Sequence, residues 1–328
     1  MTPRTLVVLW RVTERCDLAC AFCAYDRTLR RTRRVASAQR VLDFAQTLIS
    51  HRCATGARVL VSFLGGEPLS WPPLAEVTRV FRKQHGLALS LTTNGTRLAR
   101  PAVRALLIEN YSEVTVSVDG LNAAHDNLRG RDGLFASLAQ NVARLASDKR
   151  IAGKGPLLRA NVVLMRGNVA AFAPLCRELA RWGIEEITFN QLGGNDRPEF
   201  YPANRLLPEQ AGRFAAEAPA LRLELAALGV KLRGSDDYFS RITASSQNVP
   251  LSPADCAPGR DFLFIDEEGR VAPCGFTPRE YGVALEELTT AGAITDLPAR
   301  FAAQRRKAPA RACADCHSTQ HFGKFVTS

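Results

Sequence analysis

Short apolar, β-branched runs alternate with longer amphipathic stretches along the first 190 residues. The apolar runs predict six strands, at 6–12, 58–63, 87–93, 113–118, 158–164 and 186–190. Apolar positions at helical spacing predict five helices between them, at 38–50, 74–85, 97–110, 134–147 and 169–182. Six β/α units at this spacing are typical of a parallel sheet with helical crossovers. We therefore expect an α/β fold, either a partial (β/α)6 TIM-like barrel or a doubly wound sheet.

The pattern changes after residue 190. A long helical stretch at 208–228 precedes a proline- and serine-rich linker that begins at residue 245. A hairpin follows, with strands at 262–265 and 270–272 and a turn at Asp266-Glu267-Glu268-Gly269. This order predicts a barrel, a connecting helical segment and a small C-terminal cysteine-rich domain, at 1–200, 201–244 and 245–328.

The chain has 328 residues, of which 46% are apolar, so it can bury a large core. No apolar run approaches the roughly 20 residues of a membrane-spanning helix. The apolar stretch at 6–10 is too short for the core of a signal peptide. We therefore expect a cytoplasmic protein with no membrane partner, in a compartment where disulfides are rare. Its nine cysteines need another explanation.

Cys16, Cys20 and Cys23 lie in the loop after the first predicted strand. Three thiolates within eight residues do not form a closed tetrahedral zinc site without a distant fourth ligand. They can bind three irons of a [4Fe-4S] cluster and leave the fourth iron open to a small molecule. Cys53 and Cys176 stand alone in helix-like contexts and are interpreted as small buried apolar residues.

A second set of cysteines lies near the end of the chain. Four thiolates that converge can hold either zinc or a fully ligated [4Fe-4S] cluster, and their spacing does not separate the two. His317 and His321 follow the set and are interpreted as packing or solvent residues rather than ligands. The four cysteines are Cys256, Cys274, Cys313 and Cys316.

The N-terminal cysteine motif, with Phe22 before its last cysteine, resembles the signature of the radical S-adenosylmethionine (radical SAM) superfamily. Further short motifs follow the predicted strands in the order expected for that family. They are Gly65-Gly66-Glu67-Pro68, Thr93-Asn94-Gly95, Ser117-Val118-Asp119-Gly120, His125-Asp126 and Arg129-Gly130. The C-terminal cysteines resemble the twitch form of the auxiliary-cluster (SPASM) domain that some family members carry.

The resemblance implies a reduced [4Fe-4S] cluster that passes one electron to bound S-adenosyl-L-methionine. Methionine and a 5′-deoxyadenosyl radical result, and the radical removes a hydrogen atom from a substrate. The resemblance also implies an electron donor such as flavodoxin or ferredoxin, and a second cluster on the C-terminal cysteines. The residues it assigns to binding the cofactor are Phe22, Gly65, Gly66, Glu67, Pro68, Asn94, Ser117, Asp119 and Arg129.

The two glycines at 65 and 66 are expected to let the backbone approach a ligand closely, because they carry no Cβ. Asn94, Ser117 and Asp119 offer donors and acceptors for ribose hydroxyls and a carboxylate. Their alternative interpretation is as turn and capping residues. Glu67 is either a solvated turn carboxylate or a partner for a cationic amino group.

The net charge of +11 is concentrated in an arginine-rich stretch, for which a solvated loop and an electropositive rim for an anionic substrate are both considered. Its members are Arg27, Arg30, Arg31, Arg33 and Arg34. Polar residues in the loops after the last predicted strand are candidates to touch a substrate, on position alone. They are Asn195, Asp196, Arg197, Asp236, Asp237 and Tyr238.

The leading hypothesis is a radical SAM oxidoreductase that dehydrogenates a small molecule. The first alternative is epimerisation or crosslinking of a ribosomally made peptide. An epimerase would need Cys53 or Cys176 as a hydrogen donor near the barrel mouth, and the chain begins directly at its first strand without a preceding peptide-recognition domain. The second alternative is a zinc protein that binds nucleic acid. The arginine-rich stretch does not favour it, because that stretch lacks the interleaved aromatic residues typical of nucleic-acid binding.

Overall fold

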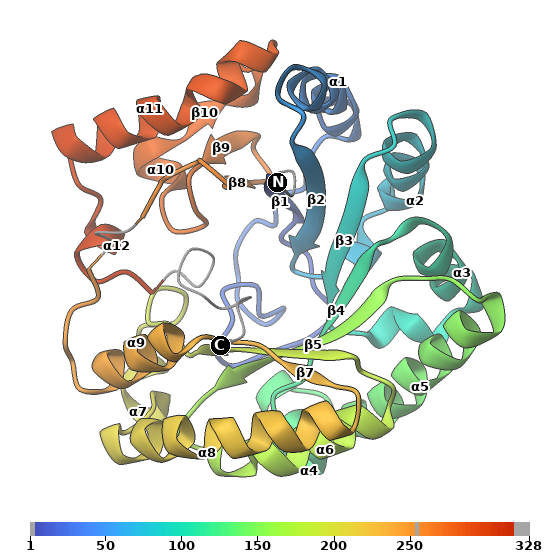
Figure 1. Ribbon diagram of the computed structural model, residues 1–328, viewed down its shortest axis with the longest axis vertical. Coiled ribbons are helices and arrows are strands. Elements are labelled where there is room, and N and C mark those ends of the chain that lie inside the picture. Colours follow the sequence, from blue (N-terminus) through green and yellow to red (C-terminus); the bar gives the residue numbers. More distant parts are fainter. Residues whose placement is uncertain (1–3, 253–255, 318–328) are drawn as a thin grey trace.

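The computed structural model describes residues 4–252 and 256–317, which form one ten-stranded sheet flanked by helices (Figure 1). The strand order is β10-β9-β8-β1-β2-β3-β4-β5-β6-β7. The strands are β1 (Thr5–Thr13), β2 (Arg58–Gly65), β3 (Ala88–Thr93), β4 (Glu113–Ser117), β5 (Leu157–Leu164), β6 (Glu186–Gln191), β7 (Lys231–Leu232), β8 (Phe262–Ile265), β9 (Arg270–Ala272) and β10 (Val283–Ala284). All neighbours from β8 to β7 pair in parallel, whereas β9 and β10 are antiparallel.

Helices lie on the outer side of the curved sheet (Figure 1). They are α1 (Ala38–Thr55), α2 (Leu74–Arg79), α3 (Pro101–Asn110), α4 (Asn122–Arg129), α5 (Leu134–Ala152), α6 (Phe172–Arg181), α7 (Tyr201–Asn204), α8 (Pro208–Ala227), α9 (Asp236–Ser246), α10 (Pro278–Tyr281), α11 (Ala291–Lys307) and α12 (Arg311–Ala314). The α/β prediction is confirmed. The form is the partial barrel and not the doubly wound sheet, because the sheet curves with its helices on one side.

The six predicted strands are all present, as is the hairpin at 262–265 and 270–272. The sequence pattern missed α9, α11 and the two-residue strand β7. The sheet also crosses both predicted domain boundaries, since β7 extends it beyond β6 and β8 pairs with β1. The division into three parts therefore remains a prediction. No helix in the described part of the chain is long and apolar enough to cross a membrane.

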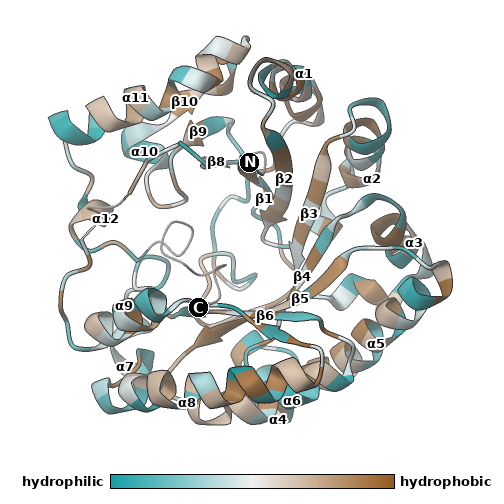
Figure 2. Cartoon of the chain, in the orientation of Figure 1, coloured by the Kyte–Doolittle hydropathy of each residue, from teal (hydrophilic) through white to brown (hydrophobic). Residues whose placement is uncertain are grey.

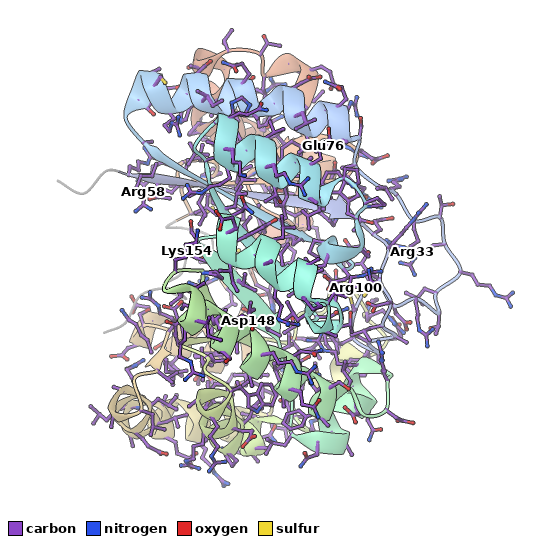
Figure 3. All side chains as sticks on the ribbon, turned by 90° about the vertical axis from the view of Figure 1, so that its right-hand side faces the viewer. Arg33, Arg58, Glu76, Arg100, Asp148 and Lys154 are labelled. Atoms are coloured by element: carbon purple, nitrogen blue, oxygen red, sulfur yellow. The ribbon has the colours of Figure 1, made fainter. Side chains whose placement is uncertain are left out.

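Alternation along β1 gives the sheet its two faces. Val8 and Trp10 are buried on the helical side, where Trp10 packs edge-on against Phe44 of α1 at 5.8 Å between ring centroids. The intervening residues, including Arg11, are half-buried on the inner face. Hydrophobic residues concentrate on the strands, while charged side chains such as Glu76 and Lys154 lie on the outer surface (Figures 2 and 3).

Polar residues occupy much of the inner face. Ser90 donates a hydrogen bond to Ser62 across β2 and β3 at 2.6 Å, and Thr188 donates to Asn161 across β5 and β6 at 3.0 Å. A TIM barrel usually fills its interior with bulky apolar side chains. This partial barrel instead has a hydroxyl- and amide-rich inner face, which suits contact with a polar ligand.

Ion pairs near the start of the strands connect β4, β5, β6 and the segment after β7. Arg159 of β5 pairs with Glu113 of β4 at 2.9 Å and with Glu186 of β6. Glu186 Oε2 also pairs with Nε of Arg233, which follows β7, at 2.5 Å. The Glu186 side chain is only 3% exposed, so its charge depends on these two guanidinium groups.

We predict that Glu186→Gln lowers the free energy of unfolding by about 3 kcal/mol, because it removes one partner from a buried ionic network. Chemical denaturation of the purified protein measures the loss. The control is Glu109→Gln, which breaks an ion pair with Lys154 whose side chains are both more than half exposed, and should change stability little. Equal losses in the two variants would contradict a buried role for the network.

Candidate functional site

The three N-terminal cysteines lie in the loop between β1 and α1, at the edge where the parallel strands end. Cys16, Cys20 and Cys23 pack with the apolar side chains of Leu18, Phe22 and Leu134 in a small cluster separate from the main core. The structure therefore brings together the residues that the sequence motif singled out.

Each of the three sulfurs receives an N–H donor from the protein. The backbone of Tyr25 donates to Cys23 Sγ at 3.3 Å, Asn94 Nδ2 lies 3.7 Å from Cys16 Sγ, and Arg129 Nη1 lies 3.9 Å from Cys20 Sγ. Donors directed at sulfur are a feature of iron–sulfur sites, where they stabilise the negative charge of the thiolates. The donor set therefore fits a [4Fe-4S] cluster.

Burial disfavours thiolate in this loop unless positive charge is supplied. It raises the pKa of Cys16 to about 11 and that of Cys23 to about 12. It also raises the pKa of Cys20, against the lowering effect of Arg129. Among the described residues, no three Cys, His, Asp or Glu side chains converge on the position of a single ion. Cluster ligands need not do so, because each binds a different iron.

The cysteine loop rests on the C-terminal end of α4. Backbone N–H groups of Ala19 and Ala21 donate to the carbonyls of Arg129 at 3.2 Å and Leu128 at 3.3 Å. Gly130 ends the helix at φ +64°, and a Cβ there would lie 2.7 Å from the Ala19 carbonyl oxygen. Glycine is therefore required by both its conformation and its neighbour.

Gly65 and Gly66 lie against the backbone that leads into the cysteine loop, while their expected contact with a ligand remains a prediction. A Cβ on Gly66 would lie 2.3 Å from the carbonyl oxygen of Arg15, and one on Gly65 would lie 2.3 Å from that of Thr13. Gly66 N–H also donates to the Thr13 carbonyl at 2.7 Å. The glycines thus admit the backbone that leads into the cysteine loop, in addition to any ligand. A substitution of Gly66 is therefore not expected to leave the cluster loop intact.

Glu67 is fully buried and is not a solvated turn carboxylate. Its Oε1 accepts from Leu69 N–H at 2.9 Å and Thr93 Oγ1 at 2.8 Å, and its Oε2 accepts from Asn94 N–H at 2.8 Å. Burial raises the pKa of this carboxyl to about 7 despite these bonds. Glu67 therefore connects the loop after β2 to the loop after β3 through hydrogen bonds. The next residue, Pro68, is also buried.

Asn94 extends this connection to the cysteine loop. Its Nδ2 donates to Asp17 Oδ1 at 2.8 Å, and Thr96 Oγ1 donates to Asp17 Oδ2 at 2.8 Å. Asp17 is a functional residue that the motif pattern did not indicate, although its position directly after Cys16 is a usable signal. A carboxylate there can anchor the loop to its neighbour.

Asp119 and Arg129 bind each other. The Arg129 Nε lies 2.7 Å from Asp119 Oδ2, its guanidinium lies 5.4 Å from the ring centroid of Phe22, and Asp119 Oδ1 accepts from Val163 N–H at 2.8 Å. Both oxygens of the carboxylate thus have partners within the protein. Ser117 is half-buried at the end of β4. Their predicted contacts with the cofactor remain predictions.

The four C-terminal cysteines come together from separate segments. Burial raises the pKa of Cys256 to about 11, and the charges of the other three cysteines raise it further. Cys274 follows β9, where Thr277 Oγ1 lies 3.4 Å from its sulfur, while Cys313 lies in α12 and Cys316 just beyond. Among the described residues, no three of these sulfurs converge on the position of a single ion, whereas the ligands of a cluster each bind a different iron.

The segment that carries Cys316 is fastened to the barrel. Arg241 of α9 donates to the Cys316 carbonyl at 2.7 Å. His317 lies 3.0 Å from Asp315 Oδ2 and 3.4 Å from Gln191 Nε2, at the end of β6. His317 is thus engaged by other side chains. His321 lies outside the described residues.

The candidate substrate residues divide into two groups. Asn195 and Asp196 are accessible, and Arg197 anchors their loop through Asp26 at 3.4 Å. Desolvation by neighbouring protein atoms raises the pKa of the Asp196 carboxyl, and the charges of Arg11 and Arg31 act in the opposite direction.

The placement of residues 236–238 in a loop was wrong. Ser235 caps α9 by accepting from Tyr238 N–H, so Asp236 and Asp237 form the first helical turn. Tyr238 is buried and donates its hydroxyl to the Phe189 carbonyl at 2.9 Å. It is a core residue.

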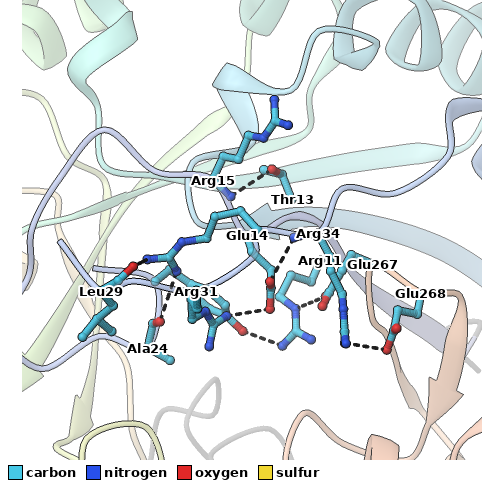
Figure 4. A network of polar contacts seen from close by, with 12 residues as sticks. Arg11, Thr13, Glu14, Arg15, Ala24, Leu29, Arg31, Arg34, Glu267 and Glu268 are labelled. Carbon is cyan, nitrogen blue, oxygen red and sulfur yellow. Dashed lines mark hydrogen bonds and ion pairs between the residues drawn. The ribbon is translucent and has the colours of Figure 1, made fainter. Parts of the chain in front are cut away.

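The arginine-rich stretch is largely tied to the protein. Arg31 pairs with Glu14 at 2.7 Å and Arg34 pairs with Glu268 at 2.8 Å (Figure 4). Arg33 donates to the Leu29 carbonyl at 3.2 Å. The loop that carries Arg33 extends away from the barrel (Figure 3). Several of these arginines therefore shape the loop beside the cysteines.

Comparison with known proteins agrees with this geometry. Residues 10–153 match the family model described as Radical SAM superfamily. An AdoMet-dependent heme synthase from Methanosarcina barkeri is 26% identical over 85% of this chain and 79% of its own length. A PqqA peptide cyclase from Gluconobacter oxydans is 28% identical over 81% of this chain and 69% of its own length.

The fold is shared with a solved structure, that of Streptococcus suis SuiB bound to S-adenosylmethionine. The two superpose with a TM-score of 0.66 at 15% identity, over 96% of this chain and 72% of SuiB. This likeness concerns the fold, while the family model and the relatives concern the sequence. Residues 10–153 therefore match the radical SAM superfamily, and the chain is similar over most of its length to the two relatives above.

Proposed function

We propose that this protein reductively cleaves S-adenosyl-L-methionine and uses the resulting radical to oxidise a substrate. The observation that carries the proposal is the gathering of Cys16, Cys20 and Cys23, each with an N–H donor, at the carboxyl edge of the parallel sheet. When bound there, the cluster supplies the electron that breaks the sulfur–C5′ bond of the cofactor.

The chain's own residues hold this site rigid. Asp17 joins the cysteine loop to the loop after β3, and Glu67 joins the loop after β2 to the same loop. Arg129 joins the cysteine loop to α4. The inner face beside them offers hydroxyl and amide groups to the polar parts of the cofactor. Asp196 is the accessible carboxylate that we propose to face the substrate.

We propose that Cys256, Cys274, Cys313 and Cys316 hold a second [4Fe-4S] cluster. Four sulfurs for four irons leave no open coordination site, which favours electron transfer over substrate binding. The substrate would lose one hydrogen atom to the 5′-deoxyadenosyl radical, then one electron to this cluster and one proton to water, which together make a net loss of two hydrogens. A small electron-transfer protein such as flavodoxin or ferredoxin would supply the electron for cofactor cleavage.

The relatives support two substrate classes, a small molecule and a peptide. The heme synthase favours the first and the PqqA peptide cyclase favours the second. Peptide epimerisation by the two isolated cysteines is not favoured. Cys176 is fully buried on α6, and Cys53 lies in the last turn of α1, which leads to the opposite end of the strands. We therefore propose oxidation, with peptide crosslinking as the alternative.

Replacing Cys16, Cys20 and Cys23 together with Ala should abolish the formation of 5′-deoxyadenosine, because no electron can reach the cofactor. Anaerobic assay with dithionite and chromatography of the products measures this. Cys53→Ala is the matched control, since that thiol is exposed and lies in the last turn of α1, outside both sets, and it should retain full activity. Product formed by the triple variant would refute the proposed function.

The Cys313→Ala, Cys316→Ala variant should lose roughly half of the iron of an eight-iron protein while it still forms 5′-deoxyadenosine. Iron, sulfide and zinc analysis of anaerobic protein tests this. The intact protein should contain about eight irons per chain and no stoichiometric zinc. About four irons and one zinc would establish the zinc alternative at the C-terminal site.

Gly66→Ala should reduce both the iron content and cofactor cleavage, because its Cβ would displace the Arg15 carbonyl beside Cys16. Iron analysis and the 5′-deoxyadenosine assay measure the two effects. Gly167→Ala is the control, since a Cβ at that position meets no atom within 4 Å. Full iron content with weakened cofactor cleavage would mean that Gly66 serves the ligand alone.

A further inference from the structure

The turn of the C-terminal hairpin reaches the N-terminal cysteine loop. Because β8 runs parallel to β1, the turn at 266–269 lies at the same edge of the sheet as the loop after β1. Glu267 in this turn is only 6% exposed. Its Oε2 accepts from Arg11 Nε at 2.5 Å, which connects the hairpin to β1 (Figure 4).

Arg11 also contacts Tyr25, so it connects Glu267 to that residue. Its Nη1 donates to the Tyr25 hydroxyl at 2.6 Å, and its guanidinium lies 5.5 Å from the ring centroid. Arg31 lies 5.3 Å from the same centroid and is itself held by Glu14 at 2.7 Å. Two guanidinium groups, each with its own carboxylate, therefore fix the position of the Tyr25 ring.

Tyr25 in turn contacts the cluster site through its backbone. Its N–H donates to Cys23 Sγ at 3.3 Å, two residues away along the chain. A hydrogen bond to a cluster sulfur stabilises the reduced cluster, which carries one more negative charge, and so raises the reduction potential. Because the ring and this N–H belong to the same residue, a shift of the Tyr25 side chain would also move its backbone and weaken the bond to Cys23.

We propose that Glu267 is a positioning residue that acts through Arg11 and Tyr25 on Cys23, so that the C-terminal hairpin helps to set the reduction potential of the N-terminal cluster. This inference rests on the proposed function, because it requires a cluster on Cys23. It gives the hairpin a role toward the first cluster that is separate from holding the C-terminal cysteines.

In Glu267→Gln, the loss of charge and the loss of the contact with Arg11 are expected to shift the reduction potential of the N-terminal cluster in opposite directions. Removal of a negative charge would by itself move the potential of a nearby cluster in the positive direction. Release of Arg11 and Tyr25 weakens the N–H···S bond and moves it in the negative direction. A negative shift therefore identifies positioning. Tyr25→Phe removes the hydroxyl bond without a change of charge and should also give a negative shift.

The test is a redox titration of the full-length, cluster-loaded protein, followed by electron paramagnetic resonance. Addition of S-adenosylmethionine identifies the signal of the cluster with an open iron. We expect negative shifts in Glu267→Gln and Tyr25→Phe at unchanged iron content. Glu268→Gln is the matched control, because this neighbouring carboxylate pairs with Arg34 and should give no negative shift.

The inference would be overturned by an unchanged or more positive reduction potential in Glu267→Gln, or by an equal negative shift in Glu268→Gln. Either result would leave the proposed function intact. Loss of iron from the N-terminal site in both Glu267→Gln and Tyr25→Phe would also overturn it, because the contact would then hold the cluster and not tune it. The absence of any signal that responds to S-adenosylmethionine would overturn the proposed function itself.

Discussion

The cysteine loop is held by close backbone contacts that only glycine permits. Gly66 lies against the Arg15 carbonyl on one side, and Gly130 lies against the Ala19 carbonyl on the other. A loop that carries three buried thiols has little apolar surface with which to fix itself, and its own cluster of side chains is small. Main-chain contact with two neighbouring loops supplies the rigidity that a metal site needs.

This constraint explains why so many polar residues at the site have protein partners. Glu67, Asn94 and Asp119 each connect elements that are distant in sequence. Asp17 receives one bond from Asn94 and a second from Thr96. Residues that a family resemblance assigns to the cofactor thus also build the frame around it. The two roles are compatible, because a carboxylate has several lone pairs and a loop presents backbone groups as well.

The continuous sheet has a further consequence for the C-terminal part. Because β8 pairs with β1, the hairpin and the barrel share one set of backbone hydrogen bonds. The second group of cysteines is consequently held against the barrel, at the end of β6 and at α9. Burial of charge at Glu267 and Arg11 reinforces this arrangement at the strand ends.

The sequence by itself determined the parallel α/β architecture, six strands, the hairpin and both groups of cysteines, because local apolar periodicity and cysteine spacing are written in neighbouring residues. It did not reveal α9, where an Asp-Asp pair resembles a loop until Ser235 caps the helix. Only the tertiary structure decided that Tyr238 is core, that Gly66 faces backbone and that Glu267 reaches Arg11. Each of these depends on segments that are far apart in sequence and are brought together by strand order, which no local pattern encodes.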